Sequence, residues 1–167
     1  HAARRDPPFD QVDFVFDGFT VAPGGSAGTS VLANDSLKGK VVLVDFWTFD
    51  CINCQHTLPY VKDWAKKYEK DGLVVIGVHT PEYGFERIID NVKAQVKKLG
   101  ITYPVAIDNN YAIWRNFDNQ YWPAHYLIDA KGQVRYTHFG EGRYDEQEKM
   151  IQQLLQEAKA DTPIPAA

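Results

Sequence analysis

The sequence predicts an α/β fold in which a mixed central sheet carries helices on both faces. Between residues 41 and 107, short apolar runs typical of buried strands alternate with segments whose apolar side chains recur at helical spacing. Between residues 124 and 158, two strand-like segments are joined by a tight turn and followed by a final helix. The first region favours parallel strands and the second an antiparallel hairpin, so the sheet should contain both kinds of pairing.

The central strand is predicted at residues 41–47, where a continuous apolar run is interrupted only by Asp45. A second buried strand is expected at residues 73–78. Helical spacing predicts one helix from residue 51 to about residue 70, with a kink at Pro59, and another from residue 85 to residue 99, ended by Gly100. The remaining predicted elements are a strand at 103–107, a short helix at 111–117, strands at 124–128 and 134–139, and a last helix around 150–158.

The chain is read as one domain, because 167 residues with 44% hydrophobic side chains suffice for one well-buried core. We assign residues 13–160 to this domain. An aromatic stretch at 14–16 and a Gly/Ser-rich loop at 23–28 predict a β-hairpin at its N-terminal side. Residues 1–12 are expected to be disordered, or a linker or tag remnant, and the Pro-containing residues 161–167 are expected to form a tail.

The charge pattern bears on possible partners. The formal net charge is -4, and the lysines are scattered along the expected helix faces rather than gathered into a basic field. Nucleic acid is therefore not an expected partner. No apolar run approaches the roughly 18 residues of a membrane-spanning helix, so no membrane span is predicted.

The two cysteines form the motif Cys51-Ile52-Asn53-Cys54 at the expected start of a helix that follows a buried strand. Unpaired backbone N–H groups and the helix dipole favour an anion there, so Cys51 is the candidate nucleophile. Cys54, one turn further along, is the candidate resolving thiol that would displace the product from a mixed disulfide. The redox group is then the cysteine pair itself, and no other cofactor and no metal is expected.

Asp50 complicates this picture. It is a candidate N-cap of the helix, yet its negative charge opposes a thiolate on the neighbouring Cys51. Whether the thiolate of Cys51 is favoured overall is therefore left open by the sequence.

Asp45 lies within the apolar central strand, six residues before Cys51. A buried carboxylate is costly unless it is neutral or partnered, and this position suits a group that takes the proton of Cys54 during the resolving step. The alternative is a carboxylate at a strand end that reaches solvent or caps a backbone group. Pro123, which follows Trp122 just before a predicted strand, is either a cis-proline or an ordinary edge proline. No chemistry is assigned to the strand histidines His79, His125 and His138.

The residues around these motifs resemble the thioredoxin superfamily at Val44-Asp45-Phe46-Trp47, at the Cys51–Cys54 motif and at Pro59. The segment from residue 38 to about residue 158 is similar to its bacterial extracytoplasmic branch of the TlpA and ResA type, with an added helix after the second strand. It resembles most closely the thioredoxin-like domain of DipZ-type proteins. That likeness is carried by residues 51–54, 77–82, 108–111, 121–124 and 139–142.

The resemblance implies a thioredoxin fold with an N-terminal β-hairpin and an inserted helix-strand element. It implies that Asp45 is the buried acid, that Pro123 is a cis-proline facing the dithiol, and that Trp47 and the Trp122 backbone line the substrate site. It also implies a location outside the cytoplasm, in the periplasm or at the outer face of a bacterial membrane. Disulfide-containing proteins there would be the partners, with a membrane electron donor of the CcdA type. The chain would be either a domain excised from a membrane-anchored protein or a free-standing relative of such a domain.

The sequence also departs from these relatives. The dipeptide Ile52-Asn53 differs from those of cytoplasmic thioredoxins and of strong periplasmic oxidants, so the redox strength does not carry over. ResA-like proteins place a glutamate three residues after the second cysteine, where this chain has Thr57. More of the proton transfer should therefore depend on Asp45.

Two other functions remain as alternatives to thiol-disulfide exchange by a reductant or electron relay. The pattern Thr48-x-x-Cys51 suits a thiol peroxidase of the peroxiredoxin type, although Val44 stands where that family has proline. A metal-carrying thioredoxin-fold chaperone would use both cysteines and a histidine such as His56. Covalent haem attachment is excluded, because Gln55 occupies the place of the required histidine.

Overall fold

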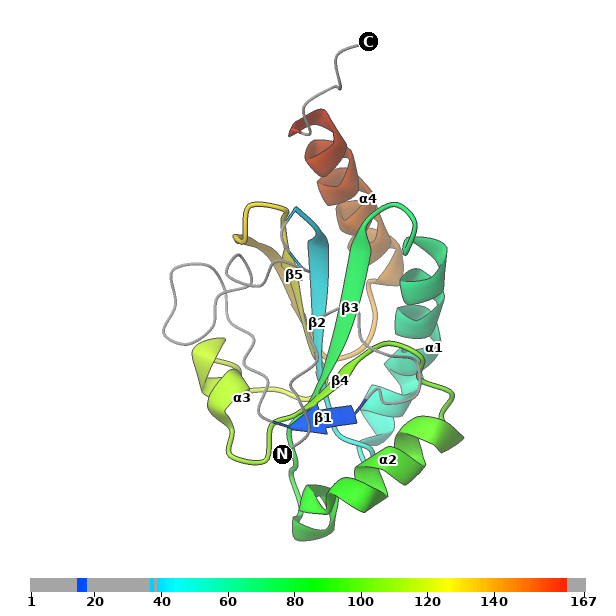
Figure 1. Ribbon diagram of the computed structural model, residues 1–167, viewed down its shortest axis with the longest axis vertical. Helices are drawn as coiled ribbons and strands as arrows, with labels where there is room; N and C mark the ends of the chain where they lie inside the picture. The colour runs from blue at the N-terminus through cyan, green and yellow to red at the C-terminus, as the bar shows by residue number, and fades with distance from the viewer. Residues whose placement is uncertain (1–14, 18–36, 38, 162–167) are drawn as a thin grey trace.

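The computed structural model describes residues 15–17, 37 and 39–161 (Figure 1). Six strands form one sheet in the order β1-β4-β3-β2-β5-β6. The pairs β1·β4, β4·β3 and β3·β2 are parallel, while β2·β5 and β5·β6 are antiparallel. The predicted mixed sheet is thereby confirmed. The strands are β1 (Val15–Asp17), β2 (Val41–Trp47), β3 (Leu73–His79), β4 (Val105–Ile107), β5 (Ala124–Ile128) and β6 (Val134–Phe139).

Helices cover both faces of the sheet, and the alternation of side chains along β2 explains how (Figure 1). Val41, Leu43 and Trp47 face a buried cluster built with α1 (Ile52–Lys67), α2 (Ile89–Lys98) and α4 (Tyr144–Asp161). Val42, Val44 and Phe46 face a second cluster on the opposite side, which includes residues of and next to α3 (Ala112–Asn116). Both faces of β2 are buried, as its apolar sequence predicts.

The inserted helix-strand element expected after β3 is present as α2 and β4, but the predicted helix over residues 85–99 is wrong in its first turn. The structure has a 3-10 turn, η2 (Gly84–Arg87), followed by an extended residue and then α2. Glu86 explains the break, because its side chain turns inward and accepts three backbone N–H groups of nearby loops. Phe85 and Ile88 were assigned to the apolar face of this helix, yet they are 46% and 52% exposed.

Of the expected N-terminal β-hairpin, the structure describes only β1, which pairs with β4 at the sheet edge. The Gly/Ser-rich loop at 23–28, the proposed segment 1–12 and nearly all of the tail lie outside the described residues. No helix in the described ranges is long and apolar enough to cross a membrane.

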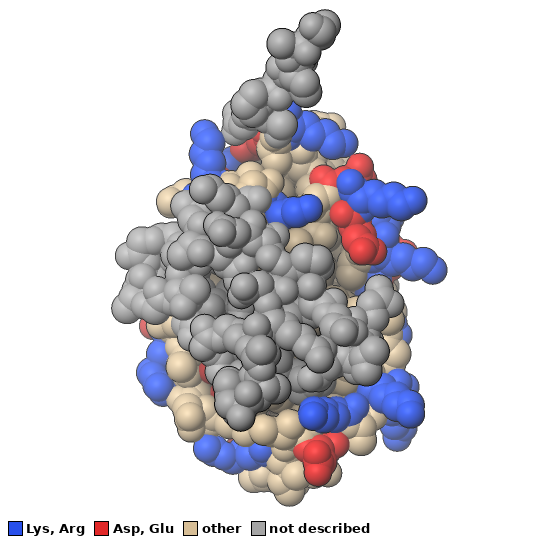
Figure 2. All heavy atoms as spheres, in the orientation of Figure 1, with Lys and Arg blue, Asp and Glu red and all other residues tan. Residues whose placement is uncertain are grey.

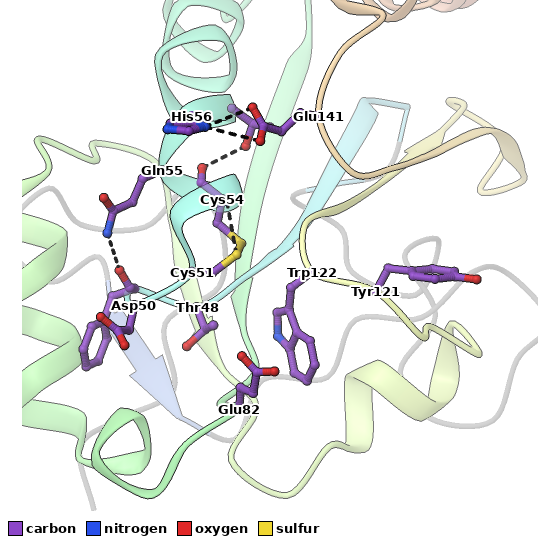
Figure 3. Close-up of a disulfide and its surroundings, with 12 residues drawn as sticks. Thr48, Asp50, Cys51, Cys54, Gln55, His56, Glu82, Tyr121, Trp122 and Glu141 are labelled. Carbon is purple, nitrogen blue, oxygen red and sulfur yellow. Dashed lines mark hydrogen bonds and ion pairs between the residues drawn. A yellow bond between two sulfur atoms is a disulfide. The ribbon is translucent and has the colours of Figure 1, made fainter.

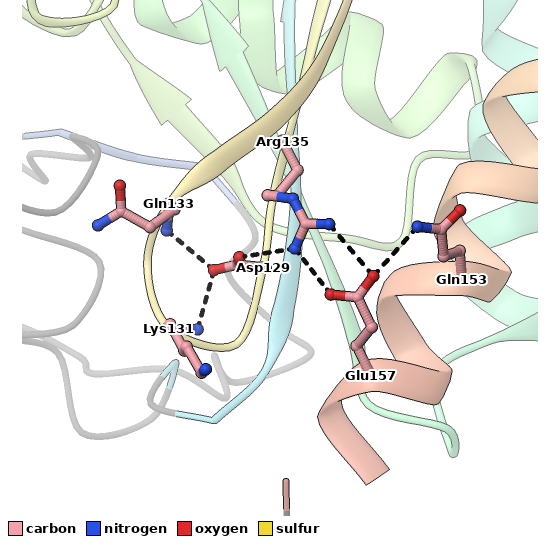
Figure 4. Close-up of polar contacts among 6 residues, drawn as sticks. All are labelled: Asp129, Lys131, Gln133, Arg135, Gln153 and Glu157. Atoms are coloured by element: carbon pink, nitrogen blue, oxygen red, sulfur yellow. Dashed lines mark hydrogen bonds and ion pairs between the residues drawn. The ribbon is translucent and has the colours of Figure 1, made fainter. Parts of the chain in front are cut away.

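The position of α4 against the sheet is held by charged groups at the turn between β5 and β6 (Figure 4). Asp129 accepts the backbone N–H groups of Lys131 and Gln133 at 3.0 Å each. Arg135 then bridges Asp129, at 3.2 Å, to Glu157 on α4, at 2.7 Å. This contact is partly exposed and contributes only modestly to stability. The buried side chains of Ile151, Leu154 and Leu155 pack α4 against the sheet, and the same helix carries the buried Gln147.

The surface charges are interspersed where they can be seen. On the face drawn in Figure 2, the described Lys and Arg side chains are spread around the molecule, and some of them lie beside Asp and Glu.

Candidate active site

The two cysteines lie at the junction of the strand β2 and the helix α1, and they form a disulfide (Figure 3). Cys51 is the N-cap of α1, and its Sγ accepts the backbone N–H of Cys54 at 3.1 Å. Cys54 is only 3% exposed, whereas Cys51 is partly exposed. Of the two sulfurs, that of Cys51 is the one that a partner can reach.

Asp50 is not the helix N-cap, contrary to the interpretation of the sequence. The cap is Cys51, and Asp50 is exposed on the loop before it. The reason lies in the fold around the loop, since the backbone N–H of Asp50 donates to Glu86 Oε2 at 3.0 Å. The sequence pattern around Glu86 was that of an ordinary helix, so it offered no signal of this contact.

Glu86 and His79 together hold the loop that precedes Cys51. Besides Asp50, the Glu86 carboxylate accepts the backbone N–H groups of Glu82 at 3.0 Å and Tyr83 at 2.8 Å. The backbone N–H of Phe49 donates to His79 Nε2 at 3.2 Å. The position of the nucleophile therefore depends on two buried side chains from the β3–α2 region.

The charges of these two side chains differ. Burial lowers the pKa of His79 to about 4, so this histidine is neutral at physiological pH. Burial alone would raise the pKa of Glu86, but hydrogen bonds from Thr48 and from the backbone of Tyr83, Asp50 and Glu82 outweigh it and hold that pKa below its ordinary value. Glu86 is therefore an anion in contact with the backbone of Asp50, the residue before Cys51.

The loop facing the disulfide contains a cis peptide bond between Trp122 and Pro123. Trp122 is partly exposed and Pro123 is buried. The indole Nε1 of Trp122 donates to the Thr80 carbonyl at 2.8 Å, and its ring lies 4.3 Å from the ring of Trp114 on α3. Figure 3 shows Trp122 beside Cys51 and Cys54. Of the residues predicted to line the substrate site, the structure thus brings Trp122 next to the dithiol.

Trp47 lies elsewhere than expected. It is only 2% exposed, and its ring packs edge to face against that of His79, with the two ring centroids 5.0 Å apart. Its Nε1 is within 3.0 Å of the point where a Cβ on Gly77 would lie. In this position Trp47 supports the site from below and offers no surface to a substrate.

Asp45 does not reach solvent. It is 1% exposed and lies on β2 between Leu43 and Trp47, on the face covered by α1, where Cys54 is also buried. Its Oδ1 is 3.2 Å from Nε2 of His125, the residue opposite it on β5. The solvent-exposed alternative for Asp45 is therefore wrong.

Sequence reasoning missed His125, because a histidine in an apolar strand is unremarkable until strand register places a carboxylate opposite it. Thr57 was noted where relatives have a glutamate. Its hydroxyl donates to the Cys54 carbonyl, one turn earlier in α1, at 2.9 Å.

Thr48, the residue behind the peroxidase alternative, is fully buried, and its hydroxyl lies 3.2 Å from His79 Nε2. Thr48 therefore contacts His79, which holds the loop before Cys51, and it is not exposed at the surface beside Cys51. His56, the candidate metal ligand, lies 3.1 Å from Glu141 at the surface. No group of three or more His, Cys, Asp and Glu side chains that could hold a metal occurs among the described residues.

A mixed sheet with a disulfide at the start of the first long helix, a cis-proline loop facing it and an acid buried behind it defines the thioredoxin-fold class of dithiol–disulfide proteins. Residues 17–155 match the family described as Redoxin. The chain belongs to this family.

Known relatives agree. The chain is 55% identical to protein DipZ of Mycobacterium tuberculosis over 130 residues, which are 78% of this chain and 19% of that protein. It is 31% identical to the thiol-disulfide oxidoreductase YkuV of Bacillus subtilis over 120 residues, which cover 72% of this chain and 80% of YkuV. A crystal structure of a thioredoxin-family thiol:disulfide interchange protein from Chlorobium tepidum superimposes with a TM-score of 0.64 at 27% identity, covering 81% and 96% of the two chains.

These relatives and the Cys51–Cys54 pair identify the chain as a thiol-disulfide oxidoreductase of the TlpA and ResA type. The chain spans about a fifth of the length of the DipZ relatives that it matches.

Proposed function

We propose that this domain reduces disulfides in protein partners outside the cytoplasm, and that it passes on electrons received from a membrane donor. The observation that carries the exchange chemistry is the asymmetry of the cysteine pair. The Cys51 sulfur is partly exposed at the N-terminus of α1, while the Cys54 sulfur is buried behind it. A partner disulfide can therefore meet only one of the two thiols first.

In the reduced domain, the Cys51 thiolate attacks one sulfur of the partner disulfide, and the other partner sulfur leaves as a thiolate. Cys54 then gives its proton to the Asp45 carboxylate and attacks the Cys51 sulfur. The bond between Cys51 and the partner breaks, and the second partner sulfur leaves with the electron pair. The partner has gained two electrons, and the domain is left with the Cys51–Cys54 disulfide.

The charges around Cys51 support the reductant direction. The buried anion Glu86 contacts the backbone of Asp50, and Asp50 itself stands next to Cys51. Glu82 is a further carboxylate on this side, and Figure 3 shows Asp50 and Glu82 near the disulfide. Negative charge disfavours the thiolate, and a less stabilised reduced form makes a dithiol a stronger reductant. The helix dipole and the N–H of Cys54 act in the opposite sense.

Trp122 and Pro123 are proposed to form the wall on which an extended partner segment lies. The hydrogen bond from Trp122 to Thr80 fixes the indole, and Ile52, next to Cys51 in the chain, has an exposed apolar side chain. An extended segment that contains the target cysteine would pair with the backbone before Pro123.

The location and the donor are proposed from the similarity to DipZ and to ResA-type oxidoreductases. A domain in such a setting needs an electron source on the membrane, and a donor of the CcdA type would supply it. The chain would then be the thioredoxin-like part of a longer, membrane-anchored protein.

Insulin reduction tests the exchange step. The reduced domain should accelerate the precipitation of insulin by dithiothreitol, and Cys51→Ser should abolish the acceleration because no other thiol is exposed to attack. An equilibrium with glutathione then tests the direction, since about 30 mV changes the exchange equilibrium tenfold. A potential near that of strong oxidants, or full activity in Cys51→Ser, would contradict the proposal.

A further inference from the structure

The buried carboxylate of Asp45 belongs to a row of residues that crosses the sheet. Asp45 on β2 lies opposite Gly77 on β3 and opposite His125 on β5, and His125 in turn lies opposite His138 on β6. Asp45 and His125 are both almost completely buried. A carboxylate and an imidazole are thus buried next to each other. Their burial is unfavourable unless the two groups form an ion pair or hold a proton between them.

The orientation of the His125 ring follows from its second partner, Gln147 on α4. The Gln147 Nε2 donates to the Gly142 carbonyl at 2.8 Å, so its Oε1 faces His125 Nδ1, 2.6 Å away. An amide oxygen can only accept, and His125 Nδ1 must therefore carry a hydrogen. The other ring nitrogen, Nε2, is left facing Asp45.

This orientation makes the pair a binding site for one proton. Nε2 of His125 and Oδ1 of Asp45 are 3.2 Å apart, outside hydrogen-bond geometry, and neither atom has another hydrogen-bond partner among the described residues. With Nδ1 already protonated, a neutral ring presents a lone pair to the carboxylate. The lone pair of Nε2 and the negatively charged Oδ1 repel each other, and a proton on either atom replaces this repulsion with a hydrogen bond.

The pair lies against the same cluster as the resolving thiol. Cys54, Leu43, Trp47 and Trp64 all belong to the buried cluster under α1, and the rings of Trp64 and His125 are 6.4 Å apart. Asp45 stands between Leu43 and Trp47 on the strand face that this cluster covers.

We propose that His125 is a positioning residue for the resolving step, and that the Asp45–His125 pair, rather than the carboxylate alone, takes the proton of Cys54. This inference rests on the proposed role of Asp45. In its proton-free state the pair carries one negative charge, accepts the proton from the Cys54 thiol and becomes neutral, while Cys54 attacks Cys51 as described above. If the pair already held a proton, accepting a second one from Cys54 would leave a buried net positive charge.

The surroundings of His125 favour the protonated ring. Burial lowers the pKa of His125, but Asp45 and Gln147 outweigh it and raise that pKa above 6.5. Burial raises the pKa of Tyr103 well above 10, which keeps its hydroxyl neutral near Asp45. Titratable side chains in and around the cluster that contacts His125 include those of Asp45, Cys54, Tyr103, Tyr136, His138, Tyr144 and Glu148.

The test is a stopped-flow reaction of the reduced domain with dithiodipyridine, which releases one coloured thiopyridone when Cys51 attacks and a second when Cys54 resolves the mixed disulfide. In His125→Gln the second phase should slow about tenfold at pH 7, because burial without a charge partner disfavours the ionised carboxylate. The first phase should stay within about twofold of wild type. His138→Gln, at the paired register position on β6, is the matched control and should leave both phases unchanged.

A direct titration keeps the inference testable if His125→Gln fails to fold. The His125 ring, followed by NMR, should titrate above pH 6.5 in wild type and at a lower pH in Asp45→Asn, because burial, the largest contribution to its pKa, is then opposed only by Gln147. Gln147→Met should also lower the midpoint. A second phase of wild-type rate in His125→Gln, or an unchanged midpoint in Asp45→Asn, overturns the inference. A wild-type domain without a first phase would instead overturn the proposed function.

Discussion

Glu86 accepts a hydrogen bond from the backbone N–H of Asp50 across 3.0 Å, and this contact ties the turn after β3 to the loop in front of the nucleophile. The two residues are 36 positions apart in the chain. The contact means that an element inserted after the second strand of the sheet helps to determine both where Cys51 lies and how much negative charge surrounds it.

Glu86→Gln should therefore change both stability and chemistry. An amide cannot accept all the N–H groups that the carboxylate accepts, so unfolding free energy should fall by about 1–3 kcal/mol. Removing the anion should also let the Cys51 thiolate form at lower pH in the reduced domain, as followed by thiolate absorbance. Glu69→Gln, an exposed change away from the site, should alter neither quantity. An unchanged thiolate titration in a folded Glu86→Gln domain would show that the Glu86 anion does not influence the ionisation of Cys51.

The mixed-disulfide intermediate should accumulate when the resolving thiol is absent. Cys54→Ser retains the exposed nucleophile, so covalent complexes with partner proteins should be seen on non-reducing gels and should disappear with dithiothreitol. Cys51→Ser should give no such complexes, because the remaining thiol is 3% exposed. Equal trapping by both variants would mean that the two cysteines are equally accessible and would contradict the assignment of roles.

Acid should destabilise the fold through His79. Its folded-state pKa of about 4 lies below the ordinary 6.5, so its contribution is complete above pH 6.5 and is lost as the pH falls toward 4. At 1.4 kcal/mol per pKa unit, lowering the pH from 7 to 4.5 should cost about 2–3 kcal/mol. Urea unfolding at the two pH values measures this loss, and it should be smaller by that amount in His79→Gln. An equal pH dependence in both proteins would show that His79 is not buried in neutral form.

A side chain at Gly77 should destabilise the fold. A Cβ at this position would lie 3.0 Å from Trp47 Nε1 and 3.1 Å from Tyr103 Cε1, so Gly77→Ala should lower the unfolding free energy by about 1–3 kcal/mol. Thermal unfolding would record this loss. Gly84→Ala is the matched control, because nothing lies within 4 Å of its Cβ position and its backbone is not in the left-handed region. Similar melting temperatures for the two variants would contradict the close packing around Gly77.

Much of the fold was accessible from local sequence. The strands at 124–128 and 134–139 have the predicted bounds, because their apolar pattern and the turn at Asp129 are local signals. The helix predicted over 85–99 was wrong at its start for the opposite reason. Phe85 and Ile88 fit the helical period, but the contact between Glu86 and Asp50 selects a 3-10 turn that places both side chains in solvent.

The sequence by itself determined the chemistry of the exchange, since the Cys51–Cys54 spacing, the preceding strand and the helix start are all encoded within a few neighbouring residues. Only the tertiary structure decided which groups surround that pair. Asp45 meets His125 through the register of two antiparallel strands, and Glu86 meets Asp50 through the packing of a turn against a loop. Such partners lie 80 and 36 residues apart, so no local pattern of spacing or polarity could reveal them.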